Sequence, residues 1–187
     1  MIKDNDPTPI IALRLKQERR KRNWSLDDLA RHTGVSKAML SKLERGEASP
    51  TAVLLGRISG ALGLTLSSLL ADGHAPGSRL ARAGDQPVWT DPQTHYLRRQ
   101  VSPLTDMPVQ LVEVELPPRR EVAFPASAYR FVRQLIWTLS GTLDFVEGGQ
   151  LHRLQSGDCL ELGEPADCIF RNRGRAPCRY LVVVARR

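Results

Sequence analysis

The sequence contains few cysteines and no long apolar run. The three cysteines, Cys159, Cys168 and Cys178, cannot all pair. We therefore expect reduced thiols and no disulfide-stabilised secreted fold. No apolar stretch is long enough to cross a membrane, and no secretion signal is recognisable. We therefore expect a cytoplasmic protein with no membrane partner.

Acidic residues are also outnumbered. The chain has 27 Lys and Arg against 20 Asp and Glu, a net charge of +7. Residues 14–45 alone contain ten basic and four acidic residues, so nearly the whole excess lies in one segment. Such a local excess is typical of proteins that bind a polyanion. A membrane surface is the alternative, but no amphipathic anchor supports it, and we expect double-stranded DNA.

Residues 25–46 predict two short helices joined by a tight turn. Ser25 is a suitable N-cap, with acidic residues following in the first turn, where the helix dipole favours negative charge. Gly34 can adopt the left-handed conformation that ends the first helix. Ser36 then caps a second helix, which runs to Arg45. Two helices about a glycine turn are typical of a helix-turn-helix motif, whose second helix inserts into the DNA major groove.

The second helix has small and basic residues on its outer face. Small side chains allow close approach to the groove, and lysine or arginine can contact phosphates or guanine edges. The alternative is a helical hairpin with a solvated charged face. The residues expected to contact DNA are Ser25, Ser36, Lys37, Ala38, Ser41, Lys42, Arg45 and Thr51.

Several short motifs in this region match a known family. They are Leu29-Ala30, Gly34-Val35-Ser36, Leu40-Ser41, Leu43-Glu44-Arg45-Gly46 and Ser49-Pro50-Thr51. With them, residues from about 11 to 70 resemble the five-helix domain of phage repressors and of the XRE (Cro/C1) family of bacterial regulators. The resemblance implies a DNA-binding domain over residues 10–71. It also implies a structural ion pair between Arg19 in the first helix and Glu44 near the end of the recognition helix.

The composition changes after this region. Residues 72–86 are rich in Gly, Ala and Pro, which predicts a linker. From residue 87 the apolar pattern has period two, and many short runs are separated by turn residues, which predicts a β-sandwich or barrel. The last run, residues 180–185, is nearly all apolar, which is typical of a strand buried on both faces. The expected strands are 94–101, 109–116, 129–139, 142–147, 150–154, 158–162, 167–172 and 178–185.

This second half resembles a cupin, a double-stranded β-helix. The resemblance depends on residues 135–143, 154–158 and 165–172, whose Ser-Gly turn, Gly-Asp turn and final Asn follow the family's order and spacing. It implies a ligand-binding and dimerisation domain over residues 87–187. The whole chain, an α + β protein of two domains, resembles bacterial regulators that join an XRE head to a cupin sensor.

Many cupins bind a metal through histidines and a glutamate, and the resemblance locates those positions. Gln134 falls on the glutamate position and Cys168 on the last histidine, while residues 127–130 match the paired-histidine region and contain none. The chain's four histidines (32, 74, 95 and 152) are scattered. We therefore expect no metal, no cofactor and no catalytic residue. Cys168 is then either a reactive thiol or a small buried hydrophobe.

Strand alternation nevertheless predicts a pocket, because it places polar and aromatic residues of different strands on inward faces. An arginine pointing into a barrel would need an anion, so the effector is expected to be a small molecule that carries a carboxylate. The alternative is that the arginines of this region face solvent. The expected ligand-binding residues are Tyr129, Arg130, Gln134, Ile136, Cys168, Phe170 and Asn172.

Together these patterns predict a homodimeric transcriptional regulator, controlled by a small molecule bound in a cupin domain that lacks the usual metal ligands. Two other functions fit the same architecture. One is a metal-dependent cupin enzyme fused to a DNA-binding head. The other is an antitoxin-type regulator whose barrel binds a partner protein.

Overall fold

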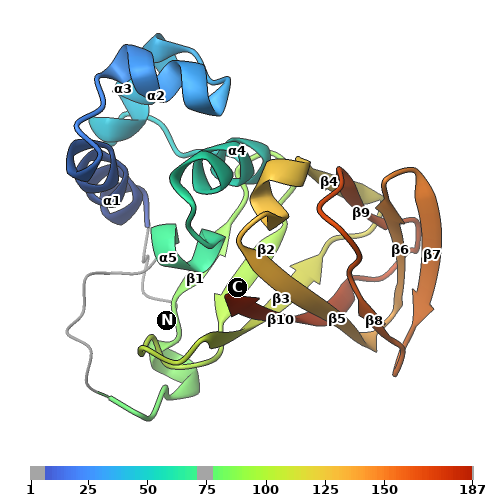
Figure 1. Cartoon of the computed structure of the whole chain (residues 1–187). Helices are drawn as coiled ribbons and strands as arrows, with labels where there is room; N and C mark the ends of the chain where they lie inside the picture. Colours follow the sequence, from blue (N-terminus) through green and yellow to red (C-terminus); the bar gives the residue numbers. More distant parts are fainter. Residues whose placement is uncertain (1–6, 71–77, 187) are drawn as a thin grey trace.

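A computed structural model describes residues 7–70 and 78–186. The helical part comes first and the strands follow, as Figure 1 shows. The helices are α1 (Thr8–Lys21), α2 (Leu26–Thr33), α3 (Lys37–Glu44), α4 (Ala52–Leu62) and α5 (Leu66–Leu70). The expected architecture of five helices followed by a β domain is confirmed.

Helix ends follow the capping chemistry of the sequence. The Ser25 side chain accepts a hydrogen bond from the Asp28 backbone, and the Asp28 carboxylate accepts one from the Ser25 backbone, at 2.8 Å. Gly34, at φ +66°, ends α2. Ser36 and Thr51 cap α3 and α4 in the same way. Each cap pairs an N–H group that the helix leaves without an acceptor.

The helices bury their apolar faces in a common core. Leu15 of α1, Leu29 of α2, Leu40 and Leu43 of α3, and Leu55 of α4 have almost no exposed surface. α3 packs against both α1 and α2. Its inward face is therefore fixed by these contacts, and its polar face is directed outward.

Ten strands form two antiparallel sheets that face each other without closing. The larger sheet has the order β1-β2-β3-β10-β5-β8, and the smaller has the order β4-β9-β6-β7. The eight strands from β3 onward form a double-sheet jelly roll, which is the cupin topology, so the expected fold is confirmed. The strands are β1 (Val88–Thr90), β2 (Leu97–Gln100), β3 (Val109–Leu116), β4 (Arg120–Phe124), β5 (Val132–Ser140), β6 (Thr142–Glu147), β7 (Gln150–Gln155), β8 (Cys159–Glu161), β9 (Cys168–Asn172) and β10 (Cys178–Arg186).

Aromatic rings fill much of the space between the sheets. Phe170 of β9 stacks on Tyr180 of β10, with ring centroids 5.7 Å apart, and lies 4.8 Å from Phe145 of β6. Phe124 of β4 meets Phe170 edge to face. These rings pack together between the two sheets and fill much of the interior of the jelly roll.

Some β elements differ from the sequence-based expectation. β1 and β4 were not predicted, because each is short and has no clear alternation of polar and apolar residues. The strand expected over 129–139 begins only at Val132, since residues 126–129 form a 3₁₀ turn, η2 (Ala126–Tyr129). The expectation that residues 180–185 are buried on both faces is wrong for the single chain: Val182 and Val184 are buried, but Leu181 and Val183 are half-exposed.

The helical and β parts contact each other directly. α4 packs on β4 and η2, and Gly60 lies so close to Ser127 that a Cβ atom there would be 2.5 Å from the Ser127 carbonyl oxygen. The Asp91 carboxylate, which follows β1, accepts a hydrogen bond from the Ala52 backbone at 2.6 Å. Of the predicted linker, residues 72–77 lie outside the described residues, and 78–86 include a short 3₁₀ turn, η1 (Ala83–Asp85).

Candidate DNA-binding surface and ligand pocket

α3 lies with α1 and α2 on the side of the molecule away from the two sheets (Figure 1). Its residues predicted to contact DNA are solvent-accessible: Ser41 is half-buried, and the others are exposed, namely Ser36, Lys37, Ala38, Lys42 and Arg45. Because Leu40 and Leu43 hold the opposite face in the core, the helix presents this surface without any rearrangement. The arrangement suits a helix that inserts into a major groove.

The basic residues of this surface differ in their partners. Lys37 lies 2.8 Å from Asp27, and Arg45 forms two hydrogen bonds with Glu47 at 2.6 and 2.7 Å. Lys42 forms no ion pair within 4 Å in the described part of the chain, although its charge contributes to lowering the pKa of Glu47 after the larger effect of the hydrogen bond from Arg45. Lys42 can therefore contact a phosphate without first breaking an ion pair.

Ser25 and Thr51 are both committed to helix caps, but not to the same degree. The Ser25 hydroxyl accepts from the Asp28 backbone and also donates to the Asp28 carboxylate at 2.6 Å. The Thr51 hydroxyl accepts from Leu54 at 3.4 Å and can still donate its own hydrogen. Of the two, Thr51 is better suited to a phosphate contact that leaves the cap intact.

The ion pair implied by the family resemblance is present. Arg19 donates from Nε and a terminal nitrogen to both oxygens of Glu44, at 2.6 and 2.8 Å, and also donates to the Trp24 carbonyl at 2.8 Å. Only 14% of the Arg19 side chain and 7% of the Glu44 side chain is exposed. The bond to Glu44 raises the pKa of Arg19. This pair joins α1 to α3 and so helps to orient the outward face of α3.

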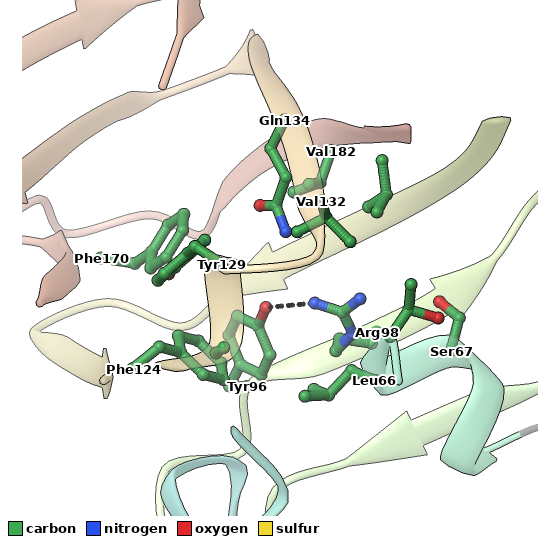
Figure 2. Close-up of a pocket in the computed structure, with 13 residues that line it drawn as sticks. Leu66, Ser67, Tyr96, Arg98, Phe124, Tyr129, Val132, Gln134, Phe170 and Val182 are labelled. Atoms are coloured by element: carbon green, nitrogen blue, oxygen red, sulfur yellow. Dashed lines mark hydrogen bonds between the residues drawn. The ribbon is translucent and has the colours of Figure 1, made fainter. Parts of the chain in front are cut away.

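A small cavity lies where α5 meets the mouth of the jelly roll, and we call it the seam pocket (Figure 2). Its volume is about 40 Å³. Three lining residues, Thr65, Leu66 and Ser67, come from the helical part. The rest come from the β part: Tyr96, Arg98, Phe124, Ala128, Tyr129, Val132, Gln134, Phe170, Val182 and Val184.

Three of the residues predicted to bind a ligand line the seam pocket, namely Tyr129, Gln134 and Phe170. The Gln134 amide points toward the open space around Arg98 (Figure 2). These residues are on η2, β5 and β9. Alternation therefore placed Gln134 and Phe170 on the inward faces of two strands that meet at this cavity, whereas Tyr129 lies in the turn before β5.

The other four predicted residues do not line it. Arg130 follows η2 and is exposed, which fits the alternative that arginines of this region face solvent. Ile136 and Cys168 are buried between the sheets and are not part of the cavity wall. Asn172 is buried, and its amide donates to the Leu116 and Ala176 carbonyls at 3.0 and 2.9 Å. The Asn172 side chain thus closes a turn and leaves no donor for a ligand.

The main residue that sequence reasoning missed is Arg98. It lies on β2, is 9% exposed, and donates to the Tyr96 hydroxyl at 3.2 Å. No carboxylate of the described residues lies within ion-pair distance of it. β2 has the sequence Leu-Arg-Arg-Gln, and a strand with two adjacent arginines does not reveal which of them points inward.

Burial determines the chemistry of the thiol at the predicted ligand position. Desolvation raises the pKa of Cys168 to about 11, and its Sγ atom contacts the Ala166 carbonyl oxygen at 3.3 Å. Little thiolate is present at neutral pH when the pKa is this high, and the thiolate is the nucleophile. Cys168 therefore behaves as a small buried hydrophobe.

The described residues at the positions where cupins bind a metal do not form a metal site. Within residues 7–70 and 78–186, no group of three or more His, Cys, Asp or Glu side chains is placed to hold a metal. Gln134 and Cys168 supply an amide and a protonated thiol, which are poor donors for the divalent metals that cupins bind. Elemental analysis of the purified protein is the direct test of this site.

Comparisons with known proteins match the helical part. The helix-turn-helix (HTH_3) family model matches residues 15–69. The transcriptional regulator SutR of Escherichia coli K12 is 46% identical over 61 residues, covering 33% of this chain and 34% of SutR. The regulator SinR of Bacillus subtilis strain 168 is 35% identical over 66 residues, covering 35% of this chain and 60% of SinR. The chain thus spans between a third and two thirds of these curated relatives.

One solved structure is similar over nearly the whole chain. It is the crystal structure of an HTH_3 family transcriptional regulator from Vibrio cholerae, with a TM-score of 0.78 and 27% identity, covering 96% of this chain and 97% of that one. Residues 15–69 therefore form an HTH_3 helix-turn-helix domain, and the jelly roll that follows them has a counterpart in the Vibrio cholerae regulator. None of the described helices has the length and apolar character that a membrane span requires.

Proposed function

We propose that the protein is a cytoplasmic, DNA-binding transcriptional regulator whose activity depends on a small molecule. The observation that carries the proposal is the outward face of α3, which is small, basic and held in place from behind by buried leucines. SutR, SinR and the similar Vibrio cholerae protein are all named as transcriptional regulators, which supports the same function.

DNA binding is proposed to use α3 for the major groove and the flanking caps for the backbone. Ser36, Lys37, Ala38 and Ser41 lie on the first turns of α3, which in a helix-turn-helix contact base edges. Lys42, Arg45, Ser25 and Thr51 would contact phosphates, which contribute sequence-independent and salt-sensitive affinity.

The test is a Lys42→Ala substitution, measured on a duplex selected from the protein's own genome. We expect the affinity to fall about tenfold and the slope of log K against log salt to decrease by about one. Arg120→Ala is the matched control: it removes one exposed positive charge from β4 and should leave both quantities unchanged. Equal affinities of the wild type and Lys42→Ala would contradict the assignment of α3.

The outer face of the larger sheet is proposed to form a homodimer. Trp137 is 46% exposed, and its register neighbours are Leu181 on β10 and Cys159 on β8. Leu135 pairs with Val183 in the same way. A second copy would cover these apolar rows and explain why residues 180–185 are apolar on both faces. A dimer also supplies the two recognition helices that half-sites about 34 Å apart require. Sedimentation equilibrium of the whole chain measures the association.

Small-molecule control is proposed to act through the seam pocket. Tyr129, Gln134 and Phe170 supply the β side of that pocket. A ligand changes DNA binding only if it binds one arrangement of the heads more tightly than the other. The contact between α5 and the β part places the pocket where such a difference can arise.

A further inference from the structure

We propose that the seam pocket binds the carboxylate of a short monocarboxylic acid through Arg98, and that the bound acid joins α5 to the β part. The inference deepens the proposed function, because it names the ligand class and the contact through which the ligand acts. It depends on three observations: the contacts of Arg98, the residues that line the cavity, and the fact that these residues come from both the helical part and the β part.

No described residue supplies a counter-ion for the buried charge of Arg98. Only 9% of the residue is exposed, and the cavity lining contains no aspartate or glutamate. An unpaired buried charge is costly unless it is neutralised or hydrogen-bonded. Among the described residues, the Arg98 side chain makes one hydrogen bond, to the Tyr96 hydroxyl. Its remaining N–H groups are therefore available to an anion in the cavity.

The polar groups around Arg98 are suited to an acceptor. The Tyr96 oxygen accepts from Arg98 at 3.2 Å, so the Tyr96 hydroxyl can donate its own hydrogen. The Gln134 amide points toward the same space (Figure 2), and its NH₂ group is a donor. A planar fork of N–H groups with further donors beside it matches a carboxylate, which has only acceptor oxygens.

The size and composition of the cavity limit the remainder of the ligand. A volume of about 40 Å³ accommodates roughly three water-sized groups. Apart from the polar cluster, the walls are mainly apolar, with Leu66, Val132, Val182 and Val184 among them. The lining holds one cation and no second one. These features favour a single carboxylate followed by a short apolar chain over a dicarboxylate or a sugar acid.

The cavity is closed on one side by the helical part. Leu66 and Ser67 belong to α5, and Thr65, directly before it, also donates from its hydroxyl to Gln110 of β3 at 3.1 Å. α5 packs against α1, and α1 holds α3 through the pair of Arg19 and Glu44. A ligand on Arg98 would therefore touch the first element of a continuous series of packed helices that ends at α3.

The binding experiment uses the full chain and isothermal titration with acetate, butyrate and hexanoate, and with butyramide as the uncharged control. We expect at least one of the acids to bind and butyramide not to bind. Arg98→Gln should weaken acid binding about 10- to 100-fold, the range expected when a hydrogen-bonded charge partner is lost. Arg99→Gln, on the same strand but facing outward, should bind as the wild type does.

Two results would overturn the proposal. One is the absence of binding by all three acids up to about 10 mM. The other is equal binding by the wild type and Arg98→Gln. Because Arg98→Gln removes an unpaired charge, we expect its melting temperature without ligand to be at or above that of the wild type. If this variant does not fold, Val132→Phe fills the cavity from β5 instead, and retention of butyrate binding by that variant would place the ligand elsewhere.

The coupling to α5 is measured separately by amide hydrogen exchange. A saturating concentration of whichever of the three acids binds most tightly should slow exchange in residues 66–70 of the wild type and leave exchange in Arg98→Gln unchanged. Unaltered exchange in the wild type with ligand bound would overturn the coupling. Neither measurement involves DNA, so a chain that binds an acid but no duplex would remove the proposed function and leave this inference intact.

Discussion

The helical part and the β part each bury an arginine, and they treat its charge in opposite ways. Arg19 has a carboxylate partner with two hydrogen bonds and a carbonyl besides. Among the described residues, the partner of the Arg98 side chain is one tyrosine hydroxyl, that of Tyr96. A buried charge with matched partners orients structural elements, whereas one without them is typical of a site that binds something else. Arg19 therefore fixes the orientation of α1 and α3, whereas Arg98 is suited to bind and release a ligand in the seam pocket.

The largest expected effect comes from breaking the paired arginine. Arg19→Ala leaves Glu44 buried without its partner, and we expect unfolding to become easier by about 3 kcal/mol. Chemical denaturation followed by circular dichroism measures the change. Arg20→Ala, one residue along and exposed, should alter stability by less than about 0.5 kcal/mol. If both variants are equally stable, Arg19 is no more structural than a surface charge.

An intermediate effect is expected where the two parts touch. Gly60→Ala would place a Cβ atom 2.5 Å from the Ser127 carbonyl oxygen. Alanine favours a helix by about 1 kcal/mol over glycine, but a backbone atom cannot move aside easily, so we expect a net loss of about 1–3 kcal/mol. Gly84→Ala, where a Cβ atom meets nothing within 4 Å, is the control in the same denaturation experiment. A neutral Gly60→Ala variant would mean that the parts are loosely joined.

The smallest effect is expected at a partly exposed charge, that of Asp28. Hydrogen bonds from the Ser25 hydroxyl, its backbone N–H and Arg31 lower the pKa of Asp28 to about 2. Because the folded pKa lies below the ordinary value of about 3.9, the stabilisation is present above about pH 4 and is lost as the pH falls toward 2. In an NMR titration of the Asp28 carboxyl carbon, Ser25→Ala should raise the pKa more than Arg31→Ala does. An unchanged value in Ser25→Ala would remove the capping explanation.

The sequence was most informative where structure depends on neighbours in the chain. Ser25, Gly34 and Ser36 act within three or four residues of their own positions, so caps and turns identify α2 and α3 directly. The pair of Arg19 and Glu44 spans 25 positions and came from the family resemblance, since no local pattern indicates it.

The ligand pocket was harder to predict, because a lining residue must lie on the inward face of its strand and must also be at the level of the cavity along that strand. Alternation correctly places Cys168, Phe170 and Asn172 on one buried face of β9, yet only Phe170 reaches the cavity. The pocket also uses α5, which belongs to the helical part and is not included in the alternation pattern of the strands. Arg98 has an arginine neighbour on the same strand, and only the pairing of β2 with β3 decides which of the two is enclosed.

The hydrogen bond between Asp91 and Ala52 has a consequence for how the chain is made and studied. The acceptor lies 39 positions after the donor, so the first turn of α4 lacks this partner until β1 has been synthesised. A fragment that ends at the last helix would leave the Ala52 amide without the Asp91 carboxylate and expose the glycine face of α4 to water. Truncated heads of this protein are therefore poor substitutes for the intact molecule in measurements of stability.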